Sequence, residues 1–293
     1  MSSRIVLATC LDLPTGDGDD LPLLRALTDL GHEVGMVAWD QPGVDWSAFD
    51  ATVIRATWNY TLRYEQFCSW VASVPRLFNP AAVVLPNTDK AYLAPLAEAG
   101  LPVVPTAVVP PGAELELPST GEFVLKPSLG AGSRGAGRFD AASPGAHQDA
   151  REHAGRLHAA GRTVLVQPYL DAVDTAGETA LIFFDGVFSH AIRKGPMLRR
   201  HVRHRVDGEA LYLPEQITPR RPSAQELVVA ERVLAHVTAG LAEPLLYARI
   251  DLLPGPDGPV LVELEVVEPS LFLGFAAGAA DRLAAAISAR VGR

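Results

Sequence analysis

The sequence predicts a mixed fold, in which an N-terminal βαβ lobe of the α/β class precedes two α+β lobes. Three observations lead to this prediction: strand and helix patterns alternate at the start, a glycine-rich loop joins two strand patterns in the middle, and two acid-bearing strand patterns lie near the end. A chain of 293 residues suits one to three closely joined lobes. We predict lobes over residues 1–86, 87–166 and 167–293.

The first lobe shows the alternation that is typical of a parallel sheet. Residues 5–10 (IVLATC) form a buried-strand pattern. Asp19 and Asp20 can cap the helical pattern that follows, because short acidic side chains accept hydrogen bonds from the free amides of a first helical turn. Further strand patterns follow at 34–40 and 51–57. Strand–helix–strand order predicts a parallel sheet covered by helices.

The later lobes contain three local signals. Residues 87–100 (NTDKAYLAPLAEAG) resemble a capped helix that ends at glycine. Asp185-Gly186 between two strand patterns predicts a tight hairpin. Ser223-x-x-Glu226 is a capping box that predicts the start of a helix. The two strand patterns near the end are residues 245–253 and 260–267.

Composition excludes several classes of protein. A formal net charge of −9 disfavours binding to the phosphate backbone of nucleic acids. The apolar stretch 5–11 is too short to span a bilayer, so we expect no membrane partner. Cys10 and Cys68 have no ligand-like spacing, which indicates a reducing compartment without a cysteine-based metal site. We therefore expect a cytoplasmic protein.

The motif Gly130-x-Gly132-x-x-Gly135 follows Lys126 and a short strand pattern. It is not a dinucleotide fingerprint, because no helix pattern follows it, and it lacks the Gly-Lys-Ser/Thr of a Walker A loop. Two interpretations remain. The loop can fold over a triphosphate, with backbone N–H groups pointing at phosphate oxygens and Lys126 supplying a charge. Alternatively, it is a flexible hairpin tip.

Carboxylates occur in both strand patterns near the end of the chain: Asp251 in the first, and Glu263 and Glu265 in the second. Residues two apart in a strand share a face. Two like charges in so apolar a strand are costly unless a cation lies between them, and carboxylates are ligands that Mg²⁺ prefers. The pattern therefore favours a magnesium site over the alternative of a solvated acidic face.

Residues 55–60 (RATWNY) follow the third strand pattern. Ligands usually bind at the C-terminal ends of parallel strands, where the Arg55 guanidinium could clamp a substrate carboxylate. Trp58, Asn59 and Tyr60 could then shape an amino-acid pocket. The alternative is that Arg55 pairs with a nearby acid and Trp58 packs between lobes.

The run 193–205 is strongly basic in this acidic chain. No aromatic residues interleave to stack bases, so RNA binding is disfavoured. A solvated loop is one interpretation, and a mobile cover that brings positive charge to a triphosphate is another. We favour the second for Arg193 and Lys194 only.

In their order and spacing these residues resemble the ATP-grasp superfamily of carboxylate–amine ligases, from about Asn87 onward. The resemblance implies that Arg249, Lys194 and Arg193 act on the reacting phosphoryl group. It implies that main-chain groups of Tyr169 and Leu170 face the adenine, that Glu178 contacts the ribose, and that Mg²⁺ is held by Asp251, Glu263 and Glu265. Where the superfamily usually has Glu-x-Asn, this chain has Glu-x-Glu, so either Glu265 or Glu268 completes the metal set. The implied ATP contacts are Lys90, Lys126, Ser128, Gly132, Ser133, Gln167, Tyr169, Leu170 and Glu178.

A narrower resemblance concerns residues 54–60 (IRATWNY), 192–196 (IRKGP) and 263–272 (ELEVVEPSLF), which are similar to the branch that contains cycloserine synthetase. It implies that the carboxylate of a small amino-acid-like substrate becomes an acylphosphate and that a C–N bond then forms, as in the cyclisation of O-ureido-D-serine to D-cycloserine. An intermolecular amino-acid ligase, a kinase and a non-catalytic nucleotide-binding module are the alternatives. A homo-oligomer remains open.

Overall fold

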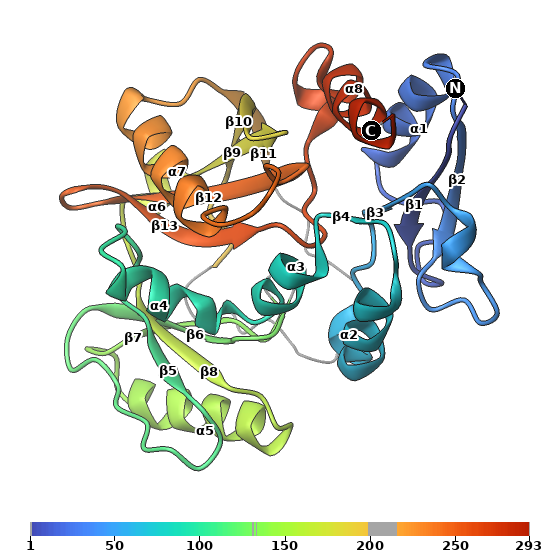
Figure 1. Cartoon of the computed structure of the whole chain (residues 1–293). Coiled ribbons are helices and arrows are strands. Elements are labelled where there is room, and N and C mark those ends of the chain that lie inside the picture. The colour runs from blue at the N-terminus through green and yellow to red at the C-terminus, as the bar shows by residue number, and fades with distance from the viewer. Residues whose placement is uncertain (1, 131, 133, 199–215, 293) are drawn as a thin grey trace.

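The computed structural model describes residues 2–130, 132, 134–198 and 216–292, and within them the strands form three sheets (Figure 1). The N-terminal lobe, blue in Figure 1, contains a parallel sheet in the order β2-β1-β3-β4. Apolar side chains cover both of its faces, as expected for a parallel sheet between helices. Its elements are β1 (Arg4–Thr9), α1 (Asp20–Asp29), β2 (Glu33–Ala38), β3 (Ala51–Ile54), α2 (Tyr64–Ser73) and β4 (Leu77–Phe78).

The middle lobe, green in Figure 1, is an antiparallel sheet in the order β5-β8-β6-β7 with α5 packed on it. Phe123, Leu125 and Leu157 lie in the apolar core between sheet and helix. The glycine-rich loop connects β6 to β7, which pair directly. The elements of this lobe are β5 (Ala107–Val109), β6 (Glu122–Pro127), β7 (Gly137–Asp140), α5 (Ala146–Ala159) and β8 (Val164–Pro168).

The C-terminal lobe is a five-stranded antiparallel sheet in the order β11-β10-β9-β12-β13. Helix α7 packs on one face of this sheet, and α8 packs on the other. Its elements are α6 (Val173–Ala176), β9 (Glu178–Phe184), β10 (Val187–Lys194), β11 (Ile217–Arg220), α7 (Ala224–Val237), β12 (Tyr247–Gly255), β13 (Gly258–Glu265) and α8 (Ala279–Val291).

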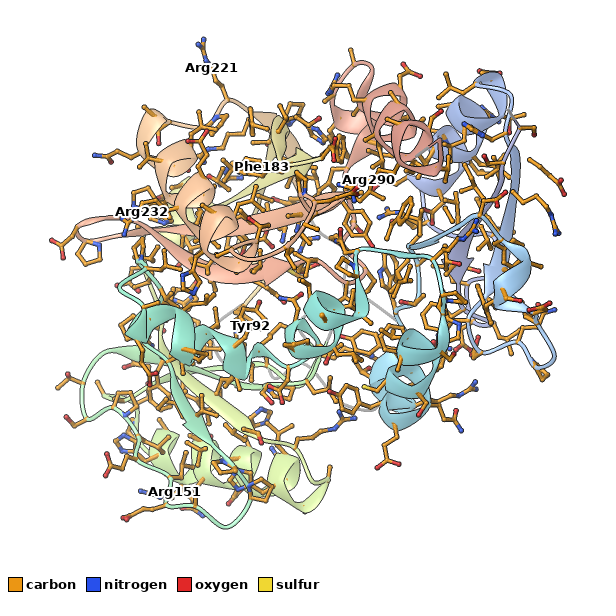
Figure 2. All side chains as sticks on the ribbon, viewed as in Figure 1. Tyr92, Arg151, Phe183, Arg221, Arg232 and Arg290 are labelled. Atoms are coloured by element: carbon orange, nitrogen blue, oxygen red, sulfur yellow. The ribbon has the colours of Figure 1, made fainter. Side chains whose placement is uncertain are left out.

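Two segments join the lobes. Helix α8 packs beside α1, so Leu27 of the first lobe shares a core with Leu283 and Ile192 of the last (Figure 1). Between the lobes, the segment with α3 (Ala81–Asn87) and α4 (Leu93–Glu98) buries Leu93 against the C-terminal sheet. Tyr92, labelled in Figure 2, exchanges hydrogen bonds of 2.8 Å with the backbone of Leu264. The expected lobe boundaries at residues 86 and 166 stay predictions.

Most local signals hold. The parallel βαβ unit, the hairpin at Asp185-Gly186 and the capping box of Ser223 and Glu226 are confirmed. The single helix expected over residues 87–100 is wrong: α3 ends at Asn87, a 3₁₀ turn spans Lys90–Tyr92, and α4 begins at Leu93. The helix breaks because the Lys90 N–H donates to the carbonyl of Ser128 in the neighbouring lobe.

The expected capping role of Asp19 is also wrong. Asp19 precedes α1, but its side chain accepts no hydrogen bond from the first turn. The carboxylate instead accepts from the N–H groups of Leu271, Phe272 and Leu273. In the described part of the chain, no helix is long and apolar enough to cross a membrane.

Candidate active site

One cavity of about 510 Å³ lies where the three lobes meet, a volume typical of sites for small ligands. Its walls come from every lobe. The N-terminal lobe contributes Trp58 and Tyr60, and the glycine-rich loop contributes Gly130 and Gly132. Other lining residues include Lys90, Lys126, Gln167, Tyr169, Leu170, Glu178, Lys194, Arg249, Glu263, Glu265 and Glu268.

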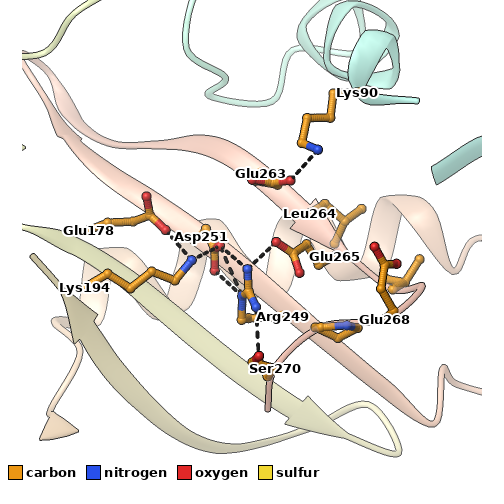
Figure 3. Close-up of polar contacts among 12 residues, drawn as sticks. Lys90, Glu178, Lys194, Arg249, Asp251, Glu263, Leu264, Glu265, Glu268 and Ser270 are labelled. Atoms are coloured by element: carbon orange, nitrogen blue, oxygen red, sulfur yellow. Dashed lines mark hydrogen bonds and ion pairs between the residues drawn. The ribbon is translucent and has the colours of Figure 1, made fainter. Parts of the chain in front are cut away.

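Strand pairing brings the acids together. Asp251 on β12 is opposite Glu263 on β13, and Arg249 is opposite Glu265. One carboxylate oxygen from each of Asp251, Glu263 and Glu265 lies within 4.8 Å of the others. Figure 3 shows these side chains on one face of the two strands. The period-two prediction for Glu263 and Glu265 is therefore confirmed.

Two cations hold Asp251, which is completely buried. Lys194 Nζ lies 2.6 Å from Asp251 Oδ2 and 2.7 Å from Glu178 Oε1. Arg249 makes a bidentate contact, with Nε 2.9 Å from Oδ1 and Nη2 2.9 Å from Oδ2 of Asp251, and it also contacts Glu265. Burial opposes ionisation of Asp251, but Arg249 and Lys194 outweigh it and lower its pKa to about 2.

Lys90 links the glycine-rich loop to the acids. Its Nζ lies 3.0 Å from Glu263 Oε1, and it also donates to the carbonyl of Gly130 (Figure 3). Burial raises the pKa of Glu263, but the opposing effect of Lys90 and Lys126 is larger and leaves it below the usual value. Lys90 therefore connects the glycine-rich loop to Glu263, one of the three clustered acids.

Two acids of the site lie where ionisation is disfavoured. Burial, with Glu263 and Asp251 nearby, raises the pKa of Glu265 to about 8 despite the contact with Arg249. Burial also raises the pKa of Glu178 to about 7, although Lys194 pairs with it. A divalent cation beside the three clustered carboxylates would favour their ionised form, and carboxylate oxygens are ligands that such an ion prefers.

Lys126 lies on β6, next to the glycine-rich loop, and faces the cavity. Within the described part of the chain, no acid forms an ion pair with it. Burial lowers its pKa, and Lys90 lowers it further, although Glu263 acts in the other direction. An anion bound beside Lys126 would favour the charged form of this lysine.

The segment after β8 forms another wall. Gln167 donates to Thr106 Oγ1 at 2.8 Å, and Arg138 lies 3.4 Å from the centroid of the Tyr169 ring. The N–H of Tyr169 already donates to the carbonyl of Glu122, and its hydroxyl donates to Asp174 Oδ1, so neither donor is open to a ligand. Ser128 is buried and does not line the cavity among the described residues, and Ser133 lies outside them.

The four residues expected at the substrate side separate into two pairs. Trp58 and Tyr60 line the cavity. Arg55 does not: it is buried, with Nε 2.9 Å from Asp20 Oδ1 and Nη1 3.1 Å from the carbonyl of Pro269. Asn59 is also buried and donates to two acids, Asp12 and Asp40. The environment of Arg55 matches the interpretation in which it pairs with acids.

Neighbouring residues on β10 face opposite ways. Lys194 reaches Asp251 in the cavity, whereas Arg193 donates to the carbonyls of Thr175 and Ala176 and does not line the cavity among the described residues. The rest of the basic run, residues 199–205, lies outside the description. Sequence reasoning did not single out Arg134, which lines the cavity, although a charged side chain inside a glycine-rich loop was a visible signal.

The family model "D-cycloserine synthetase DcsG, N-terminal domain" matches residues 5–79. Over 99% of both chains, this protein is 39% identical to the cycloserine biosynthesis protein DcsG of Streptomyces lavendulae. A crystal structure of D-cycloserine synthetase DcsG is 36% identical, with a TM-score of 0.86 over 98% of this chain and 99% of that one.

A more distant structure shares the fold alone. D-alanine–D-alanine ligase of Bacillus anthracis, complexed with ATP, is 12% identical with a TM-score of 0.63 over 100% of this chain and 98% of that one. The match to DcsG over the full chain identifies the family. The chain therefore belongs to the D-cycloserine synthetase (DcsG) family and is an ATP-grasp ligase that forms C–N bonds.

Proposed function

We propose that this enzyme uses ATP and Mg²⁺ to activate the carboxylate of a small amino acid and then closes a ring, as in the conversion of O-ureido-D-serine to D-cycloserine. One observation carries the proposal. Lys90 and Lys126 line the same cavity as Glu263 and Glu265 of β13, and Lys90 Nζ lies 3.0 Å from Glu263 Oε1. The similarity to a protein named for cycloserine biosynthesis supports the substrate.

Asp251, Glu263 and Glu265 would hold Mg²⁺. Their oxygens converge within 4.8 Å, and a dication bound there would favour the ionised form of Glu265. When bound, the ion supplies positive charge to the phosphates of ATP. Glu268 is not part of this cluster among the described residues, which favours Glu265 as the third ligand.

The side chains around this cluster account for the rest of the chemistry. Lys126 and Lys90 neutralise charge on the phosphates, while Arg249 and Lys194 keep Asp251 ionised and oriented. The substrate carboxylate attacks the γ-phosphorus and ADP leaves. A nitrogen of the same substrate then attacks the acyl carbon, loses its proton and expels phosphate. With O-ureido-D-serine, that nitrogen still carries a carbamoyl group, which water must then cleave to carbon dioxide and ammonia to give D-cycloserine. Gly130 and Gly132 line the cavity, and their lack of side chains allows the loop to close over the phosphates and exclude water.

The test is ADP release with O-ureido-D-serine as the single amino acid, with the product identified by mass spectrometry. We expect one ADP for each ring formed and no requirement for a second amine. An intermolecular ligase would release ADP only when a second amine is added, and a kinase would accumulate a phosphorylated product. Either result, or no ADP release with any small amino acid, would contradict the proposal.

A further inference from the structure

Two side chains of opposite charge line the cavity near Tyr60, and the chemistry above uses neither. Arg134 belongs to the glycine-rich loop, and Glu268 follows β13 by three residues. Tyr60 hydrogen-bonds to the Glu268 carboxyl and interacts electrostatically with Arg134. These residues therefore lie at the substrate-lobe end of the cavity rather than at the end with Lys126.

Among the residues that the structure describes, Arg134 has no acidic partner. Its Nη2 donates to Thr61 Oγ1 at 2.8 Å, and Arg162 Nη2 donates to the carbonyl of the same threonine at 2.9 Å. Within the described residues, no acid forms an ion pair with either arginine. Burial lowers the pKa of Arg134, and repulsion from Arg162 lowers it further. Of these two arginines only Arg134 lines the cavity, and a guanidinium group there without an acidic partner among the described residues favours an anionic ligand.

Glu268 shows the converse arrangement. Burial raises its pKa to about 7, although Lys90 and the Tyr60 hydroxyl both act to lower it. No cation forms an ion pair with its carboxylate in the part of the chain that the structure describes. Trp58 Nε1 donates to the Glu268 carbonyl at 3.0 Å, which fixes the backbone that carries this acid. A partly buried carboxylate that forms no direct ion pair among the described residues favours a cationic ligand group.

We propose that Arg134 and Glu268 bind the two charged ends of a zwitterionic α-amino acid, Arg134 the carboxylate to be phosphorylated and Glu268 the ammonium group. This inference rests on the proposed function and gives its substrate subsite. Both side chains line the same cavity, and no ion pair joins Arg134 to Glu268 in the described part of the chain, so the two groups do not neutralise each other. Thr61 is then a positioning residue that directs the guanidinium.

The first test compares the kinetics of Arg134→Ala and Glu268→Gln with those of the wild type. Losing a hydrogen bond to a charged group typically costs tenfold or more in affinity, so we expect the KM for the amino acid to rise about tenfold or more in each variant. The KM for ATP should change by less than about threefold. Arg162→Ala is the matched control, because Arg162 binds the same threonine but does not line the cavity among the described residues. It should behave like the wild type.

The second test separates direct contact from a general disturbance of the loop. An analogue of the substrate without its amino group, used as a competitive inhibitor, should bind wild type and Glu268→Gln equally well. The amide of the substrate should likewise bind wild type and Arg134→Ala equally well. If each variant weakened the analogue as much as the full amino acid, the proposed pairing would be overturned.

The two proposals fail in different ways. A wild-type enzyme that released ADP with no amino acid would overturn both the function and this subsite. Wild-type turnover with O-ureido-D-serine, together with an unchanged KM in both variants, would overturn the subsite alone. Turnover of only one amino acid other than O-ureido-D-serine, with a raised KM in both variants, would support the subsite and contradict the proposed substrate.

Discussion

The contact of Asp19 with the segment after β13 predicts a large loss of stability on its removal. The Asp19 carboxylate accepts from the N–H groups of Leu271, Phe272 and Leu273 at 2.7, 2.7 and 2.6 Å. Its side chain is 9% exposed, and Arg55 Nη2 lies 3.9 Å from it. Asp19→Ala would leave these buried amides without their acceptor.

The expected loss follows from those contacts. A buried donor without a partner costs roughly 1–3 kcal/mol, and relaxation of the segment favours the lower end of that range. Three such donors give a loss of about 3 kcal/mol in the free energy of unfolding. In a protein of this size that corresponds to a Tm about 6–12 °C lower. Asp19→Asn keeps one acceptor oxygen, so its loss should be about half as large.

Urea unfolding followed by circular dichroism measures this loss, with the midpoint and slope compared between variants. Asp29→Ala is the matched control, because Asp29 ends the same helix and is exposed. Its free energy of unfolding should change by less than about 0.5 kcal/mol. If Asp19→Ala were no less stable than Asp29→Ala, the reasoning that these three hydrogen bonds support the fold would be refuted.

Three further predictions concern the site and one helix. Lys126→Ala should lower kcat for ADP release by about 10²-fold or more, because it removes a cavity-lining cation that pairs with no acid among the described residues; full ADP release by the folded variant would contradict its assignment. Removal of Mg²⁺ with a chelator should abolish ADP release, and added Mg²⁺ should restore it, while activity that persists without divalent cations would exclude the proposed role of Asp251. Burial opposes ionisation of Glu226, but hydrogen bonds from Thr179 and Ser223 outweigh it and lower its pKa from 4.5. The stabilisation from this capping box is therefore complete above about pH 4.5 and is lost as pH falls through the lower folded pKa. Glu226→Gln should cost about 1 kcal/mol at pH 7 and flatten this dependence in urea titrations, and an unchanged slope below pH 4.5 would contradict it.

Short-range patterns predicted the features that depend on short-range physics. A two-residue turn at Asp185-Gly186 fixes the pairing of β9 with β10, and the capping box fixes the start of α7. The period of a strand places Glu263 and Glu265 on one face whatever else the chain does. These predictions needed no knowledge of distant parts of the chain.

The misses depend on partners that lie far away in the sequence. The carboxylate oxygens of Asp19 accept hydrogen bonds from backbone N–H groups about 250 residues later in the sequence. No local capping rule can predict partners at that distance. Arg193 and Lys194 are adjacent and similar in charge, and only the register of β10 against β9 decides that Lys194 faces the cavity. The position of Arg55 at the end of β3 was predictable from the sequence. The identity of its acid partner, Asp20, was not.

The segment from Glu268 to Leu273 connects the N-terminal lobe to the active site. Trp58 and Arg55 donate to the carbonyls of Glu268 and Pro269, and Asp19 binds the amides that follow. From the other side, Arg249 donates to the carbonyl of Ser270 while it also holds Asp251. The N-terminal lobe therefore fixes a backbone segment that contacts Arg249, the residue that binds Asp251 of the acid cluster.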